Sequence, residues 1–305
     1  MTEPLVSLNG QLIPASQAGL KIYDAGVVLG ATVTEMTRTF RHLPFRLEEH
    51  VSRLFRSLTA TRMEIGLSQE ELIKTSRELL AHNTQLIDAD DELGLIQFVT
   101  AGEYNTYLPS RDIAVRSGPT VCLHTFPIAF ALWAKRIQVG AHVVTPNIRH
   151  VPPQCYDPSM KYRSRLHFYL ADQEARQVDP QAIALLLDVE GNVTETSGAN
   201  FLIVERGTIV SPTERNTLSG VSRATVIELA ARLGIPFAER DFPPSAVMKA
   251  DEAFLSGTSI CLCPVTKING EIIGDGQPGS VYRRLIAAWS ELVGVDVAGQ
   301  FLTRL

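Results

Sequence analysis

The sequence has 305 residues, 45% of them hydrophobic, which is enough apolar material for one large buried core or two of ordinary size. Its net charge of -5 comes from interspersed charges, so nucleic acid and anionic membranes are not expected partners. The N-terminus lacks a basic start before an apolar stretch, and no apolar run is long enough to span a bilayer, so we expect a cytoplasmic protein. The 4 cysteines are expected to be reduced and buried, and no metal site is predicted.

The first part of the chain mixes strands and helices. Two hairpins are predicted, one around Asn9–Gly10 in LVSLNGQLIPA and one that joins ATVTEMTRTF to HLPFRL. Apolar residues at helical spacing predict a helix in EEHVSRLFRSLTATRM, and the capping box Ser68-x-x-Glu71 predicts the start of a second helix. The segments LGLIQFVTA and PTVCLHTF then return as strands. Residues 1–124 are therefore predicted to form a small α+β domain, followed by a connection over residues 125–136.

The second part, residues 137–305, is predicted to be a larger domain. It starts with the strand IQVGAHVVT, and after an irregular Pro-rich loop a helix is expected to begin at Lys161 in KYRSRLHFYLADQEAR. A hairpin turn at Glu190-Gly191-Asn192 follows, and then a helix capped by a serine in TLSGVSRATVIELAARLG, which is expected to end at Gly234. FLSGTSICLCPV reads as strand, loop and strand, and the helix YRRLIAAWSELV closes the chain.

Glu195 lies in GNVTETSGAN, between the apolar runs ALLLDV and FLIV of the predicted hairpin. A carboxylate that a hairpin carries into the interior is costly unless it meets a cation or several hydrogen-bond donors. Glu195 is therefore expected to have a partner. The alternative is a solvated loop glutamate just past a strand.

A possible phosphate site and a possible imine-forming lysine, taken together with Glu195, match the requirements of one cofactor. Free amides and a hydroxyl at the helix start 220–222, the small turn 257–259 and Arg53 could together enclose a phosphate monoester. Lys161 at a loop-to-helix junction could form an imine with a carbonyl, although an exposed helix-start lysine is the common alternative. Pyridoxal 5'-phosphate requires three groups in its binding site: a lysine that forms an imine, a buried carboxylate such as Glu195, and a site for the phosphate.

Five segments carry a family resemblance across nearly the whole chain. EEHVSRL, Lys161, VTETSGANF, LSGVSRATVIELA and DEAFLSGTS with the later PV occur in the order typical of fold-type IV pyridoxal-phosphate enzymes, the class IV aminotransferase family. That family includes branched-chain and D-amino acid aminotransferases, (R)-amine transaminases and aminodeoxychorismate lyase. The resemblance implies an α+β fold of two domains: a smaller N-terminal α/β sandwich, and a larger C-terminal domain with a pseudo-barrel of strands surrounded by helices. It also implies a homodimer whose active site is completed by the neighbouring subunit.

The resemblance assigns roles residue by residue. Lys161 resembles the Schiff-base lysine that also moves the proton, and Glu195 resembles the carboxylate that pairs with the pyridine nitrogen. Arg53 resembles the arginine that binds the phosphate. The remaining cofactor-binding candidates are Asn200, Val221, Ser222, Gly257 and Thr258. The amide of Asn200 could equally serve the protein structure, and His50 is expected to be a packing or hydrogen-bonding histidine.

The sequence departs from the family pattern at two positions that are expected to contact the substrate. Thr34 stands where many D-amino acid aminotransferases have tyrosine, and Ala101 stands where many members have the arginine that binds the substrate carboxylate. Because alternate strand residues share a face, Arg38 would lie on the same face as Thr34 and is a candidate replacement. The alternative is an exposed strand arginine. The other substrate-binding candidates are Tyr104 and Arg149.

The leading hypothesis is a transaminase that moves an amino group between an amino acid and a 2-oxo acid by a ping-pong mechanism, with branched-chain amino acids favoured. D-amino acids and other amines stay open as substrates. A lyase on the same cofactor is the main alternative, because Ser164-Arg165-Leu166 is similar to a motif of aminodeoxychorismate lyases. A pyridoxal-phosphate-binding protein without turnover is a third hypothesis, and it would require loss of Lys161 or Glu195, which are both present.

Overall fold

The computed structural model describes residues 3–109 and 118–305. The chain divides into two compact units. The first unit comprises Met1–Ile128 together with the short segment Met160–Ser164, and the second comprises Ala129–Ser159 and Arg165–Leu305. Lys161 thus belongs to the first unit, although it follows a long stretch of the second in the chain. The segment predicted as a connection, residues 125–136, contains the end of one strand and the first turns of a helix.

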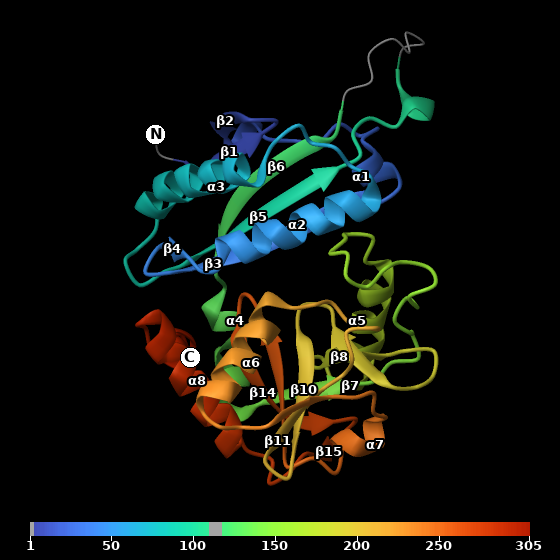
Figure 1. The fold of residues 1–305 in the computed structure, drawn as a ribbon, viewed down its shortest axis with the longest axis vertical. Helices are drawn as coiled ribbons and strands as arrows, with labels where there is room; N and C mark the ends of the chain where they lie inside the picture. The colour runs from blue at the N-terminus through green and yellow to red at the C-terminus, as the bar shows by residue number, and fades with distance from the viewer. Residues whose placement is uncertain (1–2, 110–117) are drawn as a thin grey trace. The chain divides into compact units, whose positions relative to one another are not determined.

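The first unit is built on an antiparallel sheet in the order β2-β1-β6-β5-β3-β4 (Figure 1). Its strands are β1 Leu5–Leu8, β2 Gln11–Pro14, β3 Thr32–Phe40, β4 Leu43–Pro44, β5 Leu93–Thr100 and β6 Thr120–Pro127. Both hairpins turn through left-handed residues, Asn9 and Gly10 in the first and Arg41 and His42 in the second, the conformation that two-residue hairpin turns require. The two predicted hairpins are thereby confirmed.

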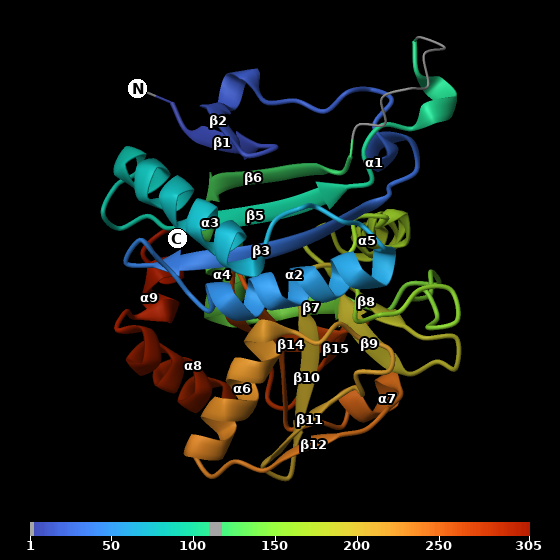
Figure 2. The ribbon, with the colours of Figure 1, turned by 45° about the horizontal axis from the view of Figure 1, so that its top comes forward.

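Helices α2 (Leu47–Thr61) and α3 (Gln69–Asn83) lie along this sheet (Figure 2). The predicted capping box of α3 is present, with Ser68 accepting from the amide of Glu71 and the Glu71 side chain accepting from the amide of Ser68. Leucines and valines of both helices form one buried core with the sheet residues that face them, including Val33 of β3. Since strand side chains alternate between faces, Glu35 shares the face of Val33 and points toward α2. Short helical turns complete the unit: α1 Ala25–Val28, η1 Ala15–Gln17, η2 Thr84–Leu86 and η3 Asn105–Tyr107.

The second unit contains a closed six-stranded ring of β10, β13, β14, β7, β8 and β9 within its larger sheet. The ring closes where β9 pairs with β10, and the pair of residues at that register is Glu195 and Asn200. The bounds of its strands are β7 Ala141–Val144, β8 Ile183–Leu187, β9 Val193–Thr196, β10 Asn200–Glu205, β13 Glu252–Gly257 and β14 Cys261–Ile268. Strands β11 (Thr208–Ser211) and β12 (Phe237–Glu239) extend the sheet from β10, and β15 (Glu271–Ile272) pairs with β14.

Helices surround the strands of the second unit (Figure 1). They are α4 Phe130–Val139, α5 Leu166–Val178, α6 Val221–Arg232, α7 Pro244–Val247, α8 Ser280–Val293 and α9 Val297–Leu302. Helix α5 packs on β7 and β8 through Phe168, Ala171 and Ala175, and the two small alanine side chains allow a close approach to the sheet. This architecture confirms the predicted two-domain fold with a pseudo-barrel in the larger part. In the part of the chain that the structure describes, no helix is long and apolar enough to cross a membrane.

Several local predictions were wrong. Lys161 does not begin a helix, because residues 161–163 lie extended against β3, with hydrogen bonds from Thr34 N to Lys161 O and from Arg163 N to Thr32 O, and α5 starts only at Leu166. Ser222 does not cap α6: the N-cap is Gly220 and no side chain caps this helix.

Two further differences concern one cysteine and the end of the chain. Cys155 is exposed, whereas the other three cysteines are buried as expected. The predicted C-terminal helix is present as α8, but the chain continues into α9, whose N-cap is Asp296.

Candidate active site

A buried ion cluster lies between β3 and α2 of the first unit. The carboxylate of Glu35 is fully buried and accepts two hydrogen bonds from Arg53, from Nε at 2.7 Å and from Nη2 at 2.7 Å. The Nδ1 atom of His50 lies 3.1 Å from Oε1 of the same carboxylate. Burial alone would raise the pKa of Glu35, but the charges of Arg53 and His50 outweigh it and hold this pKa well below its usual range. The cluster fixes the orientation of the Arg53 guanidinium, since a bidentate carboxylate sets its plane.

Lys161 is attached to the same two elements through its backbone. Its carbonyl accepts from the amide of Thr34 at 2.8 Å, and its amide donates to the Ser57 hydroxyl of α2 at 3.1 Å. The pKa of His50 is lowered by burial first; Glu35 opposes this, while the positive charges of Arg53 and Lys161 add to it. The charge of Lys161 is therefore close enough to affect the cluster.

The predicted substrate-binding residues of the first unit differ in their surroundings. Thr34 is buried and donates through Oγ1 to the Gln97 carbonyl at 3.1 Å. Arg38 is only 1% exposed, its guanidinium lies 4.0 Å from the centre of the Phe40 ring, and its Nε donates to the Thr39 carbonyl at 3.2 Å. Arg38 is thus a buried residue, so the alternative of an exposed strand arginine is wrong.

Tyr104 is half-buried and stacks edge to face with Tyr107 at a ring distance of 5.3 Å. Arg149 belongs to the second unit, where it is exposed and donates through Nη1 to the Pro146 carbonyl at 3.2 Å. Nothing in these contacts assigns a ligand to either residue.

Glu195 has the partners that its position predicted, and they come from three segments of the second unit. Its Oε2 accepts from Asn200 Nδ2 at 3.1 Å and from the backbone amide of Leu218 at 3.2 Å. Its Oε1 lies 3.5 Å from Nε2 of His150. The Glu195 side chain is 13% exposed, so the alternative of a solvated loop glutamate is wrong. Both oxygens of the carboxylate are held by groups of the protein.

Glycines close to this carboxylate allow tight backbone approaches. A Cβ atom at Gly220 would lie 2.0 Å from Oδ1 of Asn200, and a Cβ atom at Gly257 would lie 2.8 Å from the carbonyl oxygen of Gly198. A side chain at position 257 would therefore collide with backbone, and one at position 220 would force the Asn200 side chain to move. Helix α6 begins directly after Gly220, so the amides of its first turn, at Val221 and Ser222, are those that lack a partner within the helix.

Ser256 adds an unsatisfied polar group to the same region. Its hydroxyl is buried and has no hydrogen-bond partner within the described residues. It lies on β13 directly opposite Asn200, next to the turn of Gly257 and Thr258. A buried hydroxyl without a partner, a helix start and a turn that admits only glycine fit the phosphate ester of pyridoxal phosphate.

Sequence reasoning missed two residues of these clusters, Glu35 and His150, whereas it named Arg53 and expected His50 to be a packing or hydrogen-bonding histidine. Glu35 could have been found, because it stands on the apolar face of β3 together with Val33 and must meet a cation there. His50 and Arg53 are three positions apart on α2 and so share a helix face. His150 had no such signal, because its contact with Glu195 arises only when the barrel forms.

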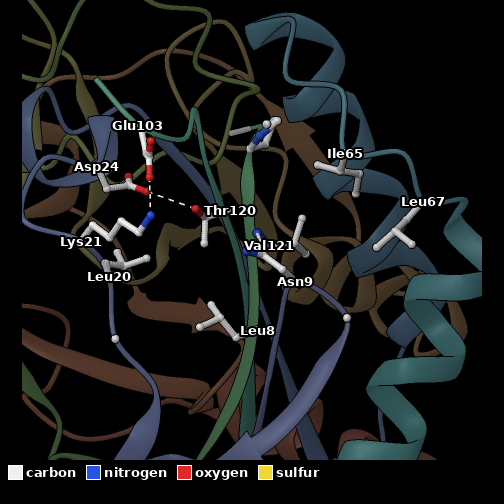
Figure 3. A pocket seen from close by; sticks show the side chains of 14 residues that line it. Leu8, Asn9, Leu20, Lys21, Asp24, Ile65, Leu67, Glu103, Thr120 and Val121 are labelled. Atoms are coloured by element: carbon white, nitrogen blue, oxygen red, sulfur yellow. Dashed lines mark hydrogen bonds and ion pairs between the residues drawn. The ribbon is translucent and has the colours of Figure 1, made fainter. Parts of the chain in front are cut away.

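A separate cavity of about 460 Å³ lies in the first unit (Figure 3). Its polar wall is internally paired: Lys21 forms an ion pair with Glu103, and Asp24 accepts from the hydroxyls of Thr100 and Thr120 at 2.9 and 3.2 Å. It is lined by none of the predicted site residues.

The fold and the sequence together define a class of enzyme. The chain belongs to the class IV aminotransferases, since the family model described as Amino-transferase class IV matches residues 32–268, and it is a transaminase. The chain is 31% identical to a putative branched-chain-amino-acid aminotransferase of Methanocaldococcus jannaschii, over 92% of this chain and 93% of that protein. It is 27% identical to a D-alanine aminotransferase of Bacillus licheniformis, over 93% and 95% of the two chains.

The structure is also similar to solved structures of branched-chain amino acid aminotransferases. The branched-chain amino acid aminotransferase of Escherichia coli superimposes with a TM-score of 0.87 at 25% identity, covering 95% of each chain. A branched-chain amino acid aminotransferase from T.th., solved with pyridoxamine 5'-phosphate, gives a TM-score of 0.85 at 26% identity, over 96% of this chain and 95% of that one. Class IV aminotransferases depend on pyridoxal phosphate.

Proposed function

We propose that this transaminase uses pyridoxal 5'-phosphate to move an amino group between an amino acid and a 2-oxo acid in two half-reactions. The observation that carries the proposal is the Glu195 carboxylate, which is largely withdrawn from solvent, held through both oxygens, and placed on the strand register that closes the barrel. When bound, the cofactor supplies an electron sink for the electron pair left by cleavage of the substrate Cα–H bond.

The chain's own residues then bind, orient and move protons. Glu195 would keep a proton on the pyridine nitrogen of the cofactor, because an anionic carboxylate stabilises a cation beside it. Asn200 and the Leu218 amide keep that carboxylate in place through Oε2. The Nζ atom of Lys161 would hold the cofactor covalently, and as a free amine it would serve as the general base for the proton of the substrate Cα.

The phosphate would be held by two kinds of donors. The amides of Val221 and Ser222 at the start of α6 and the turn of Gly257 and Thr258 offer hydrogen bonds to an anion. Arg53 would add a positive charge whose orientation is already set by Glu35. Thr34, Tyr104, Arg38 and Arg149 are our proposed contacts to the substrate.

Branched-chain amino acids are the proposed substrates, with 2-oxo acids as acceptors. The similarity to enzymes named branched-chain aminotransferases supports this choice, and the similarity to D-alanine aminotransferases makes D-amino acids the alternative to test beside it. We also propose a homodimer, on the resemblance to the family, and light scattering should give twice the mass of the chain. A cytoplasmic location stays a prediction.

The covalent assignment is tested by trapping. Borohydride reduction of the protein loaded with pyridoxal phosphate, followed by peptide mass spectrometry, should find the cofactor mass on Lys161. Lys161→Ala should lose both the label and the visible absorption of the bound cofactor, whereas Lys267→Ala, at an exposed position of β14, should keep both. A label on another lysine, or none, would overturn the assignment.

The reaction type is tested by leaving out the acceptor. A transaminase converts one equivalent of amino acid per site and then stops until a 2-oxo acid is added. A lyase that releases pyruvate would turn over without any acceptor, so sustained product formation from an aminodeoxychorismate-like substrate alone would favour the lyase.

A further inference from the structure

The ring of His150 has one nitrogen with a fixed role. Its Nδ1 lies 3.0 Å from the carbonyl oxygen of Val151, and its Nε2 lies 3.5 Å from Oε1 of Glu195. A carbonyl oxygen can only accept a hydrogen bond, so Nδ1 must carry a proton. In a neutral imidazole the Nε2 atom would then carry no proton, and its lone pair would face an anionic carboxylate oxygen.

That arrangement is repulsive unless a proton lies between the two atoms. We propose that His150 is doubly protonated, that it donates Nδ1–H to the Val151 carbonyl and Nε2–H to Glu195, and that it is a positioning residue for this carboxylate. The inference rests on the proposed function for its catalytic consequence, because it is the proposed function that gives Glu195 a pyridine nitrogen to hold. The protonation state itself does not depend on a bound cofactor.

The surroundings hold the His150 ring in place. The side chain is about 5% exposed, its backbone amide donates to the Leu187 carbonyl at 2.9 Å, and its ring meets the edge of Phe168 at a centroid distance of 5.6 Å. A charge pair withdrawn from solvent in this way is screened by salt far less than a surface pair. The contact with Glu195 is therefore built into the packing of the barrel and α5.

Two other ionisable side chains surround the His150 ring. His167 of α5 packs against it at 5.7 Å between ring centres, and burial first, then the positive charges of His150 and Arg165, lower the pKa of His167 to about 4. His167 is thus neutral at pH 7. Arg165 donates to the Ser197 carbonyl and lies over the Phe168 ring at 4.9 Å. Of these two histidines, His150 is the one whose Nε2 lies 3.5 Å from Oε1 of Glu195.

The consequence is a carboxylate with a hydrogen-bond donor at each oxygen. Asn200 and the Leu218 amide donate to Oε2, and the proposed Nε2–H of His150 lies on the side of Oε1, with 3.5 Å between the two heavy atoms. Two donors on one oxygen and one on the other fix the plane of the carboxylate, as partners of a ligating side chain do at metal sites. Removing His150 should leave Glu195 present but less well oriented.

The protonation state can be read directly by NMR on the full chain labelled with ¹⁵N-histidine at pH 7. The two-bond imidazole correlations distinguish a doubly protonated ring from a ring protonated at Nδ1 alone, and the signals of His150 are those that disappear in His150→Gln. We expect protons on both nitrogens in the wild type. In Glu195→Gln we expect Nε2 to lose its proton, because a neutral amide no longer stabilises the charge. A bare Nε2 in the wild type, or a spectrum unchanged by Glu195→Gln, would overturn the protonation proposal.

The positioning role is tested by half-transamination of the holoenzyme in a single turnover. His150→Phe keeps a ring without a donor, and its rate should fall roughly 10- to 100-fold, with little change in the amino-acid concentration needed for half-saturation. His150→Gln keeps a neutral donor and should recover part of the loss. The control is His142→Gln, which removes a histidine paired with Asp179 elsewhere in the unit and should keep the wild-type rate.

The outcomes separate this inference from the proposed function. A wild type that transaminates, with a His150→Phe variant of unchanged rate, would overturn the positioning role and leave the proposed function intact. A wild type that binds no cofactor would overturn the proposed function, while the NMR result would still decide the protonation of His150. Should His150→Phe fail to fold in a thermal melt, the His150→Gln rate and the NMR spectrum decide the question.

Discussion

Asn200 lies directly opposite Glu195 at the register where β10 pairs with β9 and closes the barrel, and its side-chain amide donates to Oε2 of Glu195 at 3.1 Å. The same amide also donates to the Leu218 carbonyl at 2.9 Å. One side chain thus joins the closing strands to the segment that leads into α6. The position of the carboxylate is therefore a property of barrel closure and not of a flexible loop.

The first prediction concerns Glu195→Gln. The cofactor should still bind through Lys161, but half-transamination should slow by about 10²-fold or more, because a neutral amide cannot stabilise a charged pyridine nitrogen. Stopped-flow absorbance after mixing with an amino acid measures this rate. Glu190→Gln is a matched control, since Glu190 is exposed in the same hairpin and its side chain pairs with the exposed Arg215. A near-wild-type rate in Glu195→Gln would remove this residue from the mechanism.

The second prediction concerns the buried Glu35. Glu35→Gln leaves the Arg53 guanidinium without its charged partner, and breaking a buried pair in this way costs about 3–5 kcal/mol in the free energy of unfolding. Urea denaturation at pH 7 measures the loss. The double variant with Arg53→Met should recover part of it, because the unpaired charge is then gone. Equal stability of Glu35→Gln and the wild type would contradict the pairing.

The third prediction also concerns Glu35: the stability of the protein should depend on pH in the acid range. The folded-state pKa of Glu35 lies below its ordinary value of 4.5, so its contribution to stability is complete above that value and is lost as the pH falls below it toward the folded-state pKa. Between about pH 5 and about pH 3, the urea midpoint of the wild type should therefore fall more than that of Glu35→Gln. Parallel curves for the two proteins would show that another group governs the acid response.

Features that depend on residues close together in the chain could be predicted from the sequence, whereas features that depend on contacts between distant segments could not. The hairpin at Asn9–Gly10 and the capping box at Ser68 follow from residues that are neighbours in the chain, and both were predicted. The helical pattern after Lys161 was overridden, because backbone hydrogen bonds to β3, a strand far away in the chain, hold this segment extended.

The partners of Glu195 show the same limit at the site. The sequence required a partner for a carboxylate at that position, because burial of an unpaired charge is too costly. It could not name His150, since a contact made by barrel closure leaves no periodic signal in either segment. A phosphate-binding role for Arg53 could be inferred from the family, but its anchor Glu35 could only be recognised from the face of β3 on which it stands.

The fourth prediction concerns the glycine turn before Thr258. Gly257→Ala would place a Cβ atom 2.8 Å from the backbone carbonyl of Gly198, so the turn must shift and the affinity for pyridoxal phosphate should fall. The dissociation constant of the cofactor, measured by fluorescence titration, should rise by at least about tenfold, which corresponds to about 1.4 kcal/mol. Gly198→Ala is the control, because a Cβ atom there meets nothing within 4 Å. Equal affinities in both variants would argue against a phosphate contact at this turn.

The last prediction concerns the substrate carboxylate, because the family resemblance leads us to expect an arginine where this chain has Ala101. A charge-assisted hydrogen bond to a carboxylate is worth about 1.5–3 kcal/mol, so loss of the true binder should raise the KM for amino acids roughly 10- to 150-fold. We expect this effect in Arg38→Ala, with the cofactor absorption unchanged and with little effect on an amine that lacks the carboxylate. Since Arg38 is buried against Phe40, its variant needs a thermal melt beside the kinetics, whereas the exposed Arg149→Ala should fold normally. If both variants bind amino acids with the wild-type KM, neither arginine holds the carboxylate, and backbone donors or an amine substrate become the better explanation.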